Sequence, residues 1–422
     1  MDVLYKQIRI VSPSKKIPKK RVDLLISKGI IKKIADNITA PKGAKILEYD
    51  DAYCSIGWMD TGAHCGEPGY EQRETLDSLR AAAANGGFTS VVVSSDLNPV
   101  IDNKAQVSFI KSGNVNAAVE VLPMGCISNA GKGENIAELI DMHQAGAVAF
   151  SDGNHSVQSG GVMQRALHYV KTFNGLICNQ PNDESVSGDG QMHEGETSTM
   201  LGLPGIPNIA EELMLKRDID ICAYTESRLH SNNISSAGSV DLIKKAKKAN
   251  LDVSASVAIM NLCFDDVALD QFDVNYKVFP PLRGTKDKQA LLKGFINGTI
   301  DLVSSNHQPL EQELKKVEFP YASFGVTAIE TTFSLLLTLV SDKFKLEDII
   351  YKLAYAPRTI FRIDIPEIVE GAQANLCIFT PNVEWVYEKG NVKSKSSNSP
   401  LFGHTLKGKI YSVYNKNQLV EN

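Results

Sequence analysis

The feature that most constrains this chain is a long alternation of strand-length apolar runs with helical patterns, from residue 53 to residue 364. Such an alternation is typical of βα units that build a parallel sheet. With the strand that opens the stretch Ser55–Gly69, the number of repeats approaches the eight of a (β/α)₈ barrel. The further candidate strands are Thr89–Ser94, Val119–Met124, Ala147–Ser151, Leu176–Asn179, Ile221–Tyr224, Val253–Val257 and Leu302–Ser304. The helical stretches include Glu74–Ala84, Asn135–Gln144, Ala210–Arg217, Ser239–Ala249, Lys286–Ile296 and Thr327–Val340.

Both ends of the chain have a different texture. Residues 1–52 and 365–422 contain short alternating β runs separated by turns that are rich in Lys and Gly. The simplest topology is a small β-sandwich built from both ends, with the barrel inserted between them. We therefore expect three segments, 1–52 and 365–422 for the sandwich and 53–364 for the barrel.

Composition excludes several classes of protein. The hydrophobic fraction of 43% and the charged fraction of 22% are those of an ordinary globular protein. The net charge of −5 argues against a nucleic acid or an anionic membrane as the main partner. No apolar run approaches the roughly 18 residues of a spanning helix, and no signal-peptide pattern opens the chain. The seven scattered cysteines, without a C-x-x-C pair, indicate reduced thiols and a cytoplasmic location.

Several short sequence fragments follow one another in a characteristic order along the chain. The first lies in Ser55–Gly69, where Gly57, Asp60, His64 and the tripeptide Glu67–Gly69 stand out. The later ones are Asn98–Asp102, Gly146–Asp152, His193–Glu196, Leu201–Pro207, Ala237–Val240, Pro280–Arg283, Asn297–Asp301 and Phe324–Gly325. In order and spacing these fragments resemble the dihydroorotases of the amidohydrolase superfamily, in their long-chain type. The resemblance covers nearly the whole chain and implies a metal-dependent hydrolase barrel whose chemistry lies at the carboxyl ends of its strands.

The resemblance also assigns the metal positions, and most of them have lost their ligands. The family's two histidines on the first strand fall on Gly62 and His64, and the bridging aspartate of the fourth strand is retained as Asp152. Two further histidine ligands fall on Gln180 and Asn233. A catalytic zinc needs about three protein ligands, and amide oxygens are poor zinc ligands compared with imidazole. We therefore expect no zinc, and a two-zinc site only if the protein is an active enzyme.

The catalytic and substrate positions are replaced as well. The general acid/base aspartate of the family falls on Asn306, which has no titratable group near neutral pH. The arginine that binds the substrate carboxylate falls on Gly66, which removes bidentate recognition. Two substrate-binding asparagines fall on Asp96 and Phe279. A structural reading of the retained groups is simpler: His64 as a hydrogen-bonded group at a strand end, and Asp152 as a turn acid.

We therefore interpret the chain as a dihydroorotase-like protein of pyrimidine biosynthesis that is catalytically inactive. Its expected role is that of a structural partner of aspartate transcarbamoylase, in a homo- or hetero-oligomer. One alternative is a dihydroorotase, or a related cyclic-amide hydrolase, with a rearranged metal site to which His155 or His193 would contribute. Another alternative is a sensor that binds a small molecule without converting it. No single segment of the sequence identifies a partner.

Overall fold

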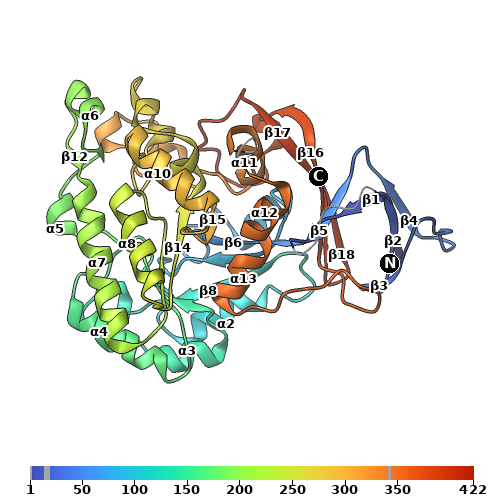
Figure 1. The fold of residues 1–422 in the computed structure, drawn as a ribbon, viewed down its shortest axis with the longest axis horizontal. Helices are drawn as coiled ribbons and strands as arrows, with labels where there is room; N and C mark the ends of the chain where they lie inside the picture. Colours follow the sequence, from blue (N-terminus) through green and yellow to red (C-terminus); the bar gives the residue numbers. More distant parts are fainter. Residues whose placement is uncertain (1, 14–19, 341–343) are drawn as a thin grey trace.

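The structure is a computed structural model that describes residues 2–13, 20–340 and 344–422, and it has two parts lying side by side (Figure 1). The larger part contains eight parallel strands in sequential order, which confirms the predicted barrel. These strands are β6 (Trp58–Ala63), β7 (Phe88–Val93), β8 (Glu120–Gly125), β9 (Ala149–Phe150), β10 (Ile177–Asn179), β13 (Leu229–Ser231), β14 (Val253–Ala258) and β15 (Leu302–Ser304).

The barrel is closed between its first and last strands by a side chain and a short backbone contact. The buried carboxylate of Asp60, on β6, accepts hydrogen bonds from the backbone nitrogen and the hydroxyl of Ser305, both at 2.7 Å. Just after β6, the backbone nitrogen of His64 donates to the carbonyl oxygen of His307 at 2.8 Å. The aspartate of the first-strand motif therefore joins the two ends of the sheet.

Helices cover the outside of the barrel (Figure 1). The first helix begins with a capping box in which Thr75 and Ser78 exchange hydrogen bonds. Within the described residues no helix is both long and apolar enough to cross a membrane. The helices are α1 (Leu76–Asn85), α2 (Lys104–Ser112), α3 (Leu139–Ala145), α4 (Gly160–Lys171), α5 (Glu184–Ser187), α6 (Glu196–Leu201), α7 (Asn208–Thr225), α8 (Ala237–Lys248), α9 (Ile259–Cys263), α10 (Thr285–Ile296), α11 (Thr332–Val340), α12 (Leu346–Ile350) and α13 (Ala356–Phe361).

One expected strand is wrong. The run Ile221–Tyr224 forms the last turn of α7, and the sixth repeat places its strand later, at β13. The buried positions of α7 recur at helical spacing through Asp218, Ile219, Cys222 and Thr225, so the apolar run continues the helix. Periodicity alone cannot decide whether a run of four apolar residues is a strand or part of a helix.

The second part is a sheet made from both ends of the chain, as expected. Its strand order is β18-β17-β16-β5-β1-β2-β3, and β4 pairs with β1. The strands are β1 (Asp2–Ile10), β2 (Val22–Ser27), β3 (Ile30–Ala35), β4 (Lys45–Glu48), β5 (Tyr53–Ile56), β16 (Leu376–Val386), β17 (Thr405–Asn415) and β18 (Gln418–Glu421). The division into segments 1–52, 53–364 and 365–422 stays a prediction; strand β5, which starts at Tyr53, pairs with β1 and β16 in this sheet.

The two parts share an aromatic core. The ring of Trp58, fully buried at the start of β6, lies 4.7 Å from Phe333 of α11 and 5.4 Å from Phe379 of β16, measured between centroids. Its indole nitrogen donates to the hydroxyl of Ser55 at 2.9 Å. A large aromatic side chain that contacts both parts stabilises them as one unit.

Candidate functional site

The positions that the sequence assigns to the site lie where the strands of the barrel end. His64 follows β6 and Asp96 follows β7, and these two strands are neighbours. The ring nitrogen Nδ1 of His64 lies 3.1 Å from the carboxylate of Asp96. Burial raises the pKa of Asp96, but the charge of His64 outweighs burial and holds this pKa well below its usual value. The carboxylate of Asp96 thus binds the ring of His64, the retained histidine of the first strand.

Gly62 leaves no room for the histidine that the family has there. A β-carbon at this position would lie 2.9 Å from Cβ and 3.0 Å from Oγ of Ser304, on the neighbouring strand β15. Contacts this short are not tolerated between carbon atoms, so a side chain at this position would require Ser304 to move. Gly62 and Ser304 are therefore matched to each other.

The retained aspartate Asp152 is buried and bound on both of its oxygens. Its Oδ1 accepts hydrogen bonds from the backbone nitrogens of Ile127 and Ser128 at 2.8 and 3.0 Å, and its Oδ2 accepts the Ser128 hydroxyl at 2.5 Å. Burial raises the pKa of Asp152 despite these three donors. The side chain fixes the loop after β8, in agreement with the simpler reading of Asp152 as a turn acid.

Asn233 and Asn306 form a network of amides and hydroxyls. The amide nitrogen of Asn233 donates to the side-chain oxygen of Asn306 at 3.2 Å, and its own oxygen accepts the hydroxyl of Ser304 at 2.5 Å. Asn306 donates in turn to the carbonyl oxygen of Phe279 at 2.9 Å. Both asparagines have positive φ, 51° and 47°, a conformation that asparagine tolerates better than most residues. The ring of Phe279 packs against Phe324, with 5.8 Å between the centroids.

The two remaining positions, Gly66 and Gln180, are also structural in character. A β-carbon on Gly66 would lie 2.1 Å from the carbonyl oxygen of Tyr70 and 2.5 Å from that of Glu74, so this tight turn admits only glycine. The backbone carbonyl of Gln180 accepts the hydroxyl of Ser156, and its buried amide nitrogen has no partner in the described part of the chain.

These residues do not fit a two-zinc site. Within residues 2–13, 20–340 and 344–422, no group of three or more His, Cys, Asp or Glu side chains could hold a metal ion. Of the five assigned positions only His64 and Asp152 carry such ligands, and both are engaged by Asp96 and by the loop after β8. The disagreement lies in the chemistry of the donors and in their existing hydrogen bonds.

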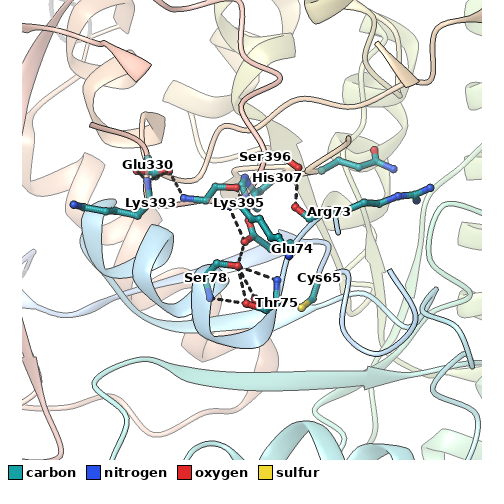
Figure 2. Close-up of polar contacts among 12 residues, drawn as sticks. Cys65, Arg73, Glu74, Thr75, Ser78, His307, Glu330, Lys393, Lys395 and Ser396 are labelled. Carbon is teal, nitrogen blue, oxygen red and sulfur yellow. Dashed lines mark hydrogen bonds and ion pairs between the residues drawn. The ribbon is translucent and has the colours of Figure 1, made fainter. Parts of the chain in front are cut away.

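A second polar cluster, centred on Glu74, lies beside the site (Figure 2). The buried carboxylate of Glu74 accepts the hydroxyls of Ser78 and Ser394 and the backbone nitrogen of Lys395, and it lies 3.4 Å from Nε2 of His307. The other ring nitrogen of His307 accepts the backbone nitrogen of Ala328, which leaves the proton of a neutral ring on Nε2. Ser394 donates to the carboxylate and not to the imidazole, so this cluster is not a nucleophilic triad.

The sequence did not predict the His64–Asp96 pair or the cluster around Glu74. Glu330 accepts the backbone nitrogens of Lys393 and Ser394, and Asn398 accepts the backbone nitrogen of Leu310, so the polar loop 393–399 is bound to the barrel. One signal could have revealed the His64–Asp96 pair: opposite charges follow two consecutive parallel strands, whose carboxyl ends lie together.

Two cavities open at the barrel mouth. One has a volume of about 500 Å³ and is lined by Asn154, His155, Asn182, Phe279, Gln308 and Phe324, among others. The other, of about 410 Å³, includes Lys132, Glu134, Asp152, His155 and Glu184. These volumes lie in the usual range of small-molecule sites. His155 lines both cavities, whereas His193 lies in the short strand β11 (Met192–His193), before α6.

The comparisons with known proteins agree on the family and on the fold. A family model described as dihydro-orotase-like matches residues 55–239. A protein named dihydroorotase from Syntrophus aciditrophicus is 36% identical over 423 residues, covering 100% of this chain and 99% of its own length. A second one, from Thermoanaerobacter sp., is 38% identical and covers 92% and 90%. Among solved structures, L-hydantoinase (dihydropyrimidinase) from Arthrobacter aurescens has a TM-score of 0.86 at 19% identity, covering 100% of this chain and 96% of its own, which concerns the fold alone.

Proposed function

Since this chain belongs to the dihydroorotase-like family, we propose that it is a non-catalytic member that acts in pyrimidine biosynthesis as a structural partner of aspartate transcarbamoylase. The observation that carries the proposal is the state of Asp152, whose two carboxylate oxygens hold the loop after β8. A carboxylate bound in this way contributes to the fold and is not free to bridge two metal ions.

The chemistry of ring closure lacks its other groups too. Opening or closing a cyclic amide by the family's route needs a Lewis acid and a group that carries a proton. Asn306 stands at the acid/base position, and its amide is bound to Asn233 and to the carbonyl of Phe279. The turn at Gly66 has no space for an arginine that would bind the substrate carboxylate. Proton transfer and carboxylate recognition would therefore both need groups from elsewhere.

The names of the curated relatives favour a second candidate, a dihydroorotase or related cyclic-amide hydrolase with a rearranged metal centre. In this reading Asp152 would release Ser128, and His155 and Glu184, which line the same cavity, would complete a ligand set. A third candidate, a sensor, is supported by the two cavities at the mouth, which remain open although the metal positions are occupied by hydrogen bonds.

An exposed apolar surface on the rim of the barrel supports the partner role. Three rim loops share a small buried cluster of Met192, Leu269 and Phe319. In the same segments of the chain, apolar side chains remain in solvent, with Met200 73% and Tyr321 78% exposed. We call these side chains the rim surface; its members are Met200, Val267, Phe272, Val317 and Tyr321. Exposed apolar side chains of this kind are typical of protein–protein contacts where they form a patch.

The activity assay separates the first two candidates. Dihydroorotate formation from carbamoyl-aspartate is measured with the wild type, with Asp152→Ala and with an intact dihydroorotase as the positive control. We expect the wild type and Asp152→Ala to be equally inactive. Turnover by the wild type that is lost in Asp152→Ala would establish the enzyme and refute the proposal.

The partner role is tested by co-expression with the aspartate transcarbamoylase of the same organism, followed by size-exclusion chromatography with light scattering. We expect one hetero-oligomer that buries more than roughly 1,000 Å². Met200→Asp with Tyr321→Asp should separate the two proteins, whereas Val115→Asp, at a 76% exposed position outside the rim surface, should not. If the wild-type proteins elute separately at micromolar concentration, the partner role fails and thermal-shift screening with pyrimidine metabolites tests the sensor.

A further inference from the structure

A cavity of about 190 Å³ lies at the edge of the barrel mouth, where three chain segments meet. One segment follows β14 and contributes Val274 and Asn275. Another follows β15 and contributes Leu310, Gln312, Lys315 and Lys316. The third is the C-terminal stretch, which contributes Lys389, Ser397, Asn398, Ser399 and Phe402. The cavity shares no lining residue with the two cavities at the mouth. Leu310 also lines a small pocket beside His64 and Asp96, so the cavity adjoins the candidate site but has a lining of its own.

The lining of this cavity is basic. Three lysines contribute to it, Lys315, Lys316 and Lys389, together with the polar side chains of Gln312, Ser397, Asn398 and Ser399. Among the described residues that line it there is no carboxylate. Three positive charges beside hydroxyl and amide groups, without a lining acid, form a site for a negative charge.

Lys315 is the innermost of the three cations. It is 5% exposed, and its ammonium donates to the carbonyl oxygens of Val274 at 2.7 Å and Lys277 at 3.3 Å. Burial, together with repulsion from Lys277, lowers the pKa of Lys315 to about 7, and Asp273 opposes this shift from beyond ion-pair distance. The carboxylate of Asp273 caps the backbone nitrogen of Asn275. The ammonium thus lacks an ion-pair partner in the described part of the chain, which is a costly state for a buried charge.

We propose that this cavity binds a small oxyanion of the phosphate class, either inorganic phosphate or the phosphate group of a monoester. Lysine ammonium groups and hydroxyls are standard donors to phosphate oxygens. The volume is below the roughly 300 Å³ at which sites for larger ligands begin, which favours a compact ion. The proposal goes beyond the structural role proposed above and does not depend on it.

Bound phosphate would link the C-terminal stretch to two barrel loops. Asn398 already connects the C-terminal stretch to the loop after β15, because its side chain donates to the carbonyl of Gln308 and accepts the backbone nitrogen of Leu310, both at 3.0 Å. Lys389 reaches the cavity from the same stretch and lies 5.8 Å from the ring centroid of Phe402. An anion between Lys389, Lys316 and Lys315 would add charge-assisted bonds across the same junction.

Isothermal titration calorimetry of the full-length protein tests the proposal, with inorganic phosphate and glycerol 3-phosphate as probes at constant ionic strength. The test variant is Lys316→Gln with Lys389→Gln; both side chains are exposed, so the fold should be retained. The matched control is Lys244→Gln with Lys248→Gln, which makes the same charge change at exposed positions on α8. We expect saturable binding that weakens at least tenfold in the test variant and is unchanged in the control.

The two probes identify the source of the anion. Glycerol 3-phosphate binding more tightly than phosphate would indicate a monoester, and equal affinities would indicate the free ion; both results support the site. Absence of saturable binding to the wild type overturns the proposal. Equal weakening in the test and control variants also overturns it, because the effect would then follow net charge and not the cavity.

Discussion

His64, at an expected metal position, instead forms an ordinary side-chain contact with Asp96. Asp96 stands where the resemblance assigns a substrate-binding asparagine, and His64 stands at a ligand position. Their side chains now form a largely buried pair, 15% and 20% exposed. The substitution of a neutral amide by a carboxylate gives the histidine a partner within the protein itself.

This pairing predicts that Asp96→Asn destabilises the protein, because the amide keeps the shape but removes the charge that His64 faces. The expected loss in the free energy of unfolding is about 1–3 kcal/mol at pH 6, a range typical of partly buried polar pairs. Urea denaturation followed by circular dichroism measures it. Asp241→Asn, at an exposed position on α8, is the control. An unchanged midpoint in Asp96→Asn would mean that the pair contributes nothing.

Gly66 gives a second residue-scale prediction. Gly66→Ala places a methyl group 2.1 Å from the carbonyl oxygen of Tyr70, so the turn must be rebuilt, at an expected cost of about 2–4 kcal/mol. Gly390→Ala is the matched control, since nothing lies within 4 Å of its β-carbon. Thermal unfolding compares the two variants. If Gly66→Ala unfolds at the same temperature as Gly390→Ala, the turn is not restricted to glycine.

The sequence predicted which residues stand at the expected site positions, but not the contacts that these residues make. The expected lack of metal ligands at Gly62, Gln180 and Asn233 follows from the resemblance together with the residue types. The contact of Gly62 with Ser304 does not, because it joins strands more than 200 residues apart and depends on register. Cross-strand neighbours are fixed by tertiary structure, which a single sequence does not specify.

At the scale of elements, the C-terminal segment 393–399 fastens the sandwich part to the mouth of the barrel. Its backbone bonds to Glu330 and Glu74, two buried carboxylates on different elements (Figure 2). The segment is a polar loop rich in serine, lysine and asparagine, and its composition alone gives no sign that buried carboxylates accept its backbone nitrogens.

The cluster predicts an acid-dependent effect of Glu74→Gln. Burial raises the pKa of Glu74, but hydrogen bonds from His307, Ser394 and Ser78 outweigh it and lower the pKa below its ordinary value of 4.5. A carboxylate with a lowered pKa contributes stability above its unfolded-state pKa, and this stability is lost as the pH falls through the folded-state pKa. Glu74→Gln should therefore cost about 2–4 kcal/mol at pH 7 and progressively less below about pH 4.5.

Urea denaturation at pH 7 and at the lowest pH at which the wild type remains folded measures this dependence. Glu313→Gln, at an exposed position, should show little effect at either pH. A cost of Glu74→Gln that stays constant over the whole range would show that the carboxylate charge is not what holds the segment.

For the whole molecule, the order of the strands followed from the alternation of patterns, and the sheet from both ends followed from their texture. The misplaced sixth strand did not disturb this result, because the number of repeats, and not the exact bounds of each, determines a barrel. The retained fragments lie at turns and strand ends that build the frame, such as Asp60 at the seam. The frame was therefore predictable, whereas the state of its mouth depended on side-chain contacts.

The whole molecule is also predicted to bind no stoichiometric zinc, because its donors are too few and are engaged. Elemental analysis after expression in zinc-supplemented medium should give well under one ion per chain, while an intact dihydroorotase purified in parallel supplies the reference value. One or two zinc ions per chain that disappear in His64→Ala or Asp152→Ala would contradict this prediction.

The contacts of Ser304 have a consequence for any attempt to build a metal site at this end of the barrel. Ser304 occupies the space that a histidine at residue 62 would need, and it also holds Asn233, which in turn holds Asn306. Gly62→His or Asn233→His alone would break these contacts without completing a set of three metal ligands. The side chains at this end of the barrel are thus coupled, and a functional metal site would require several of them to change together.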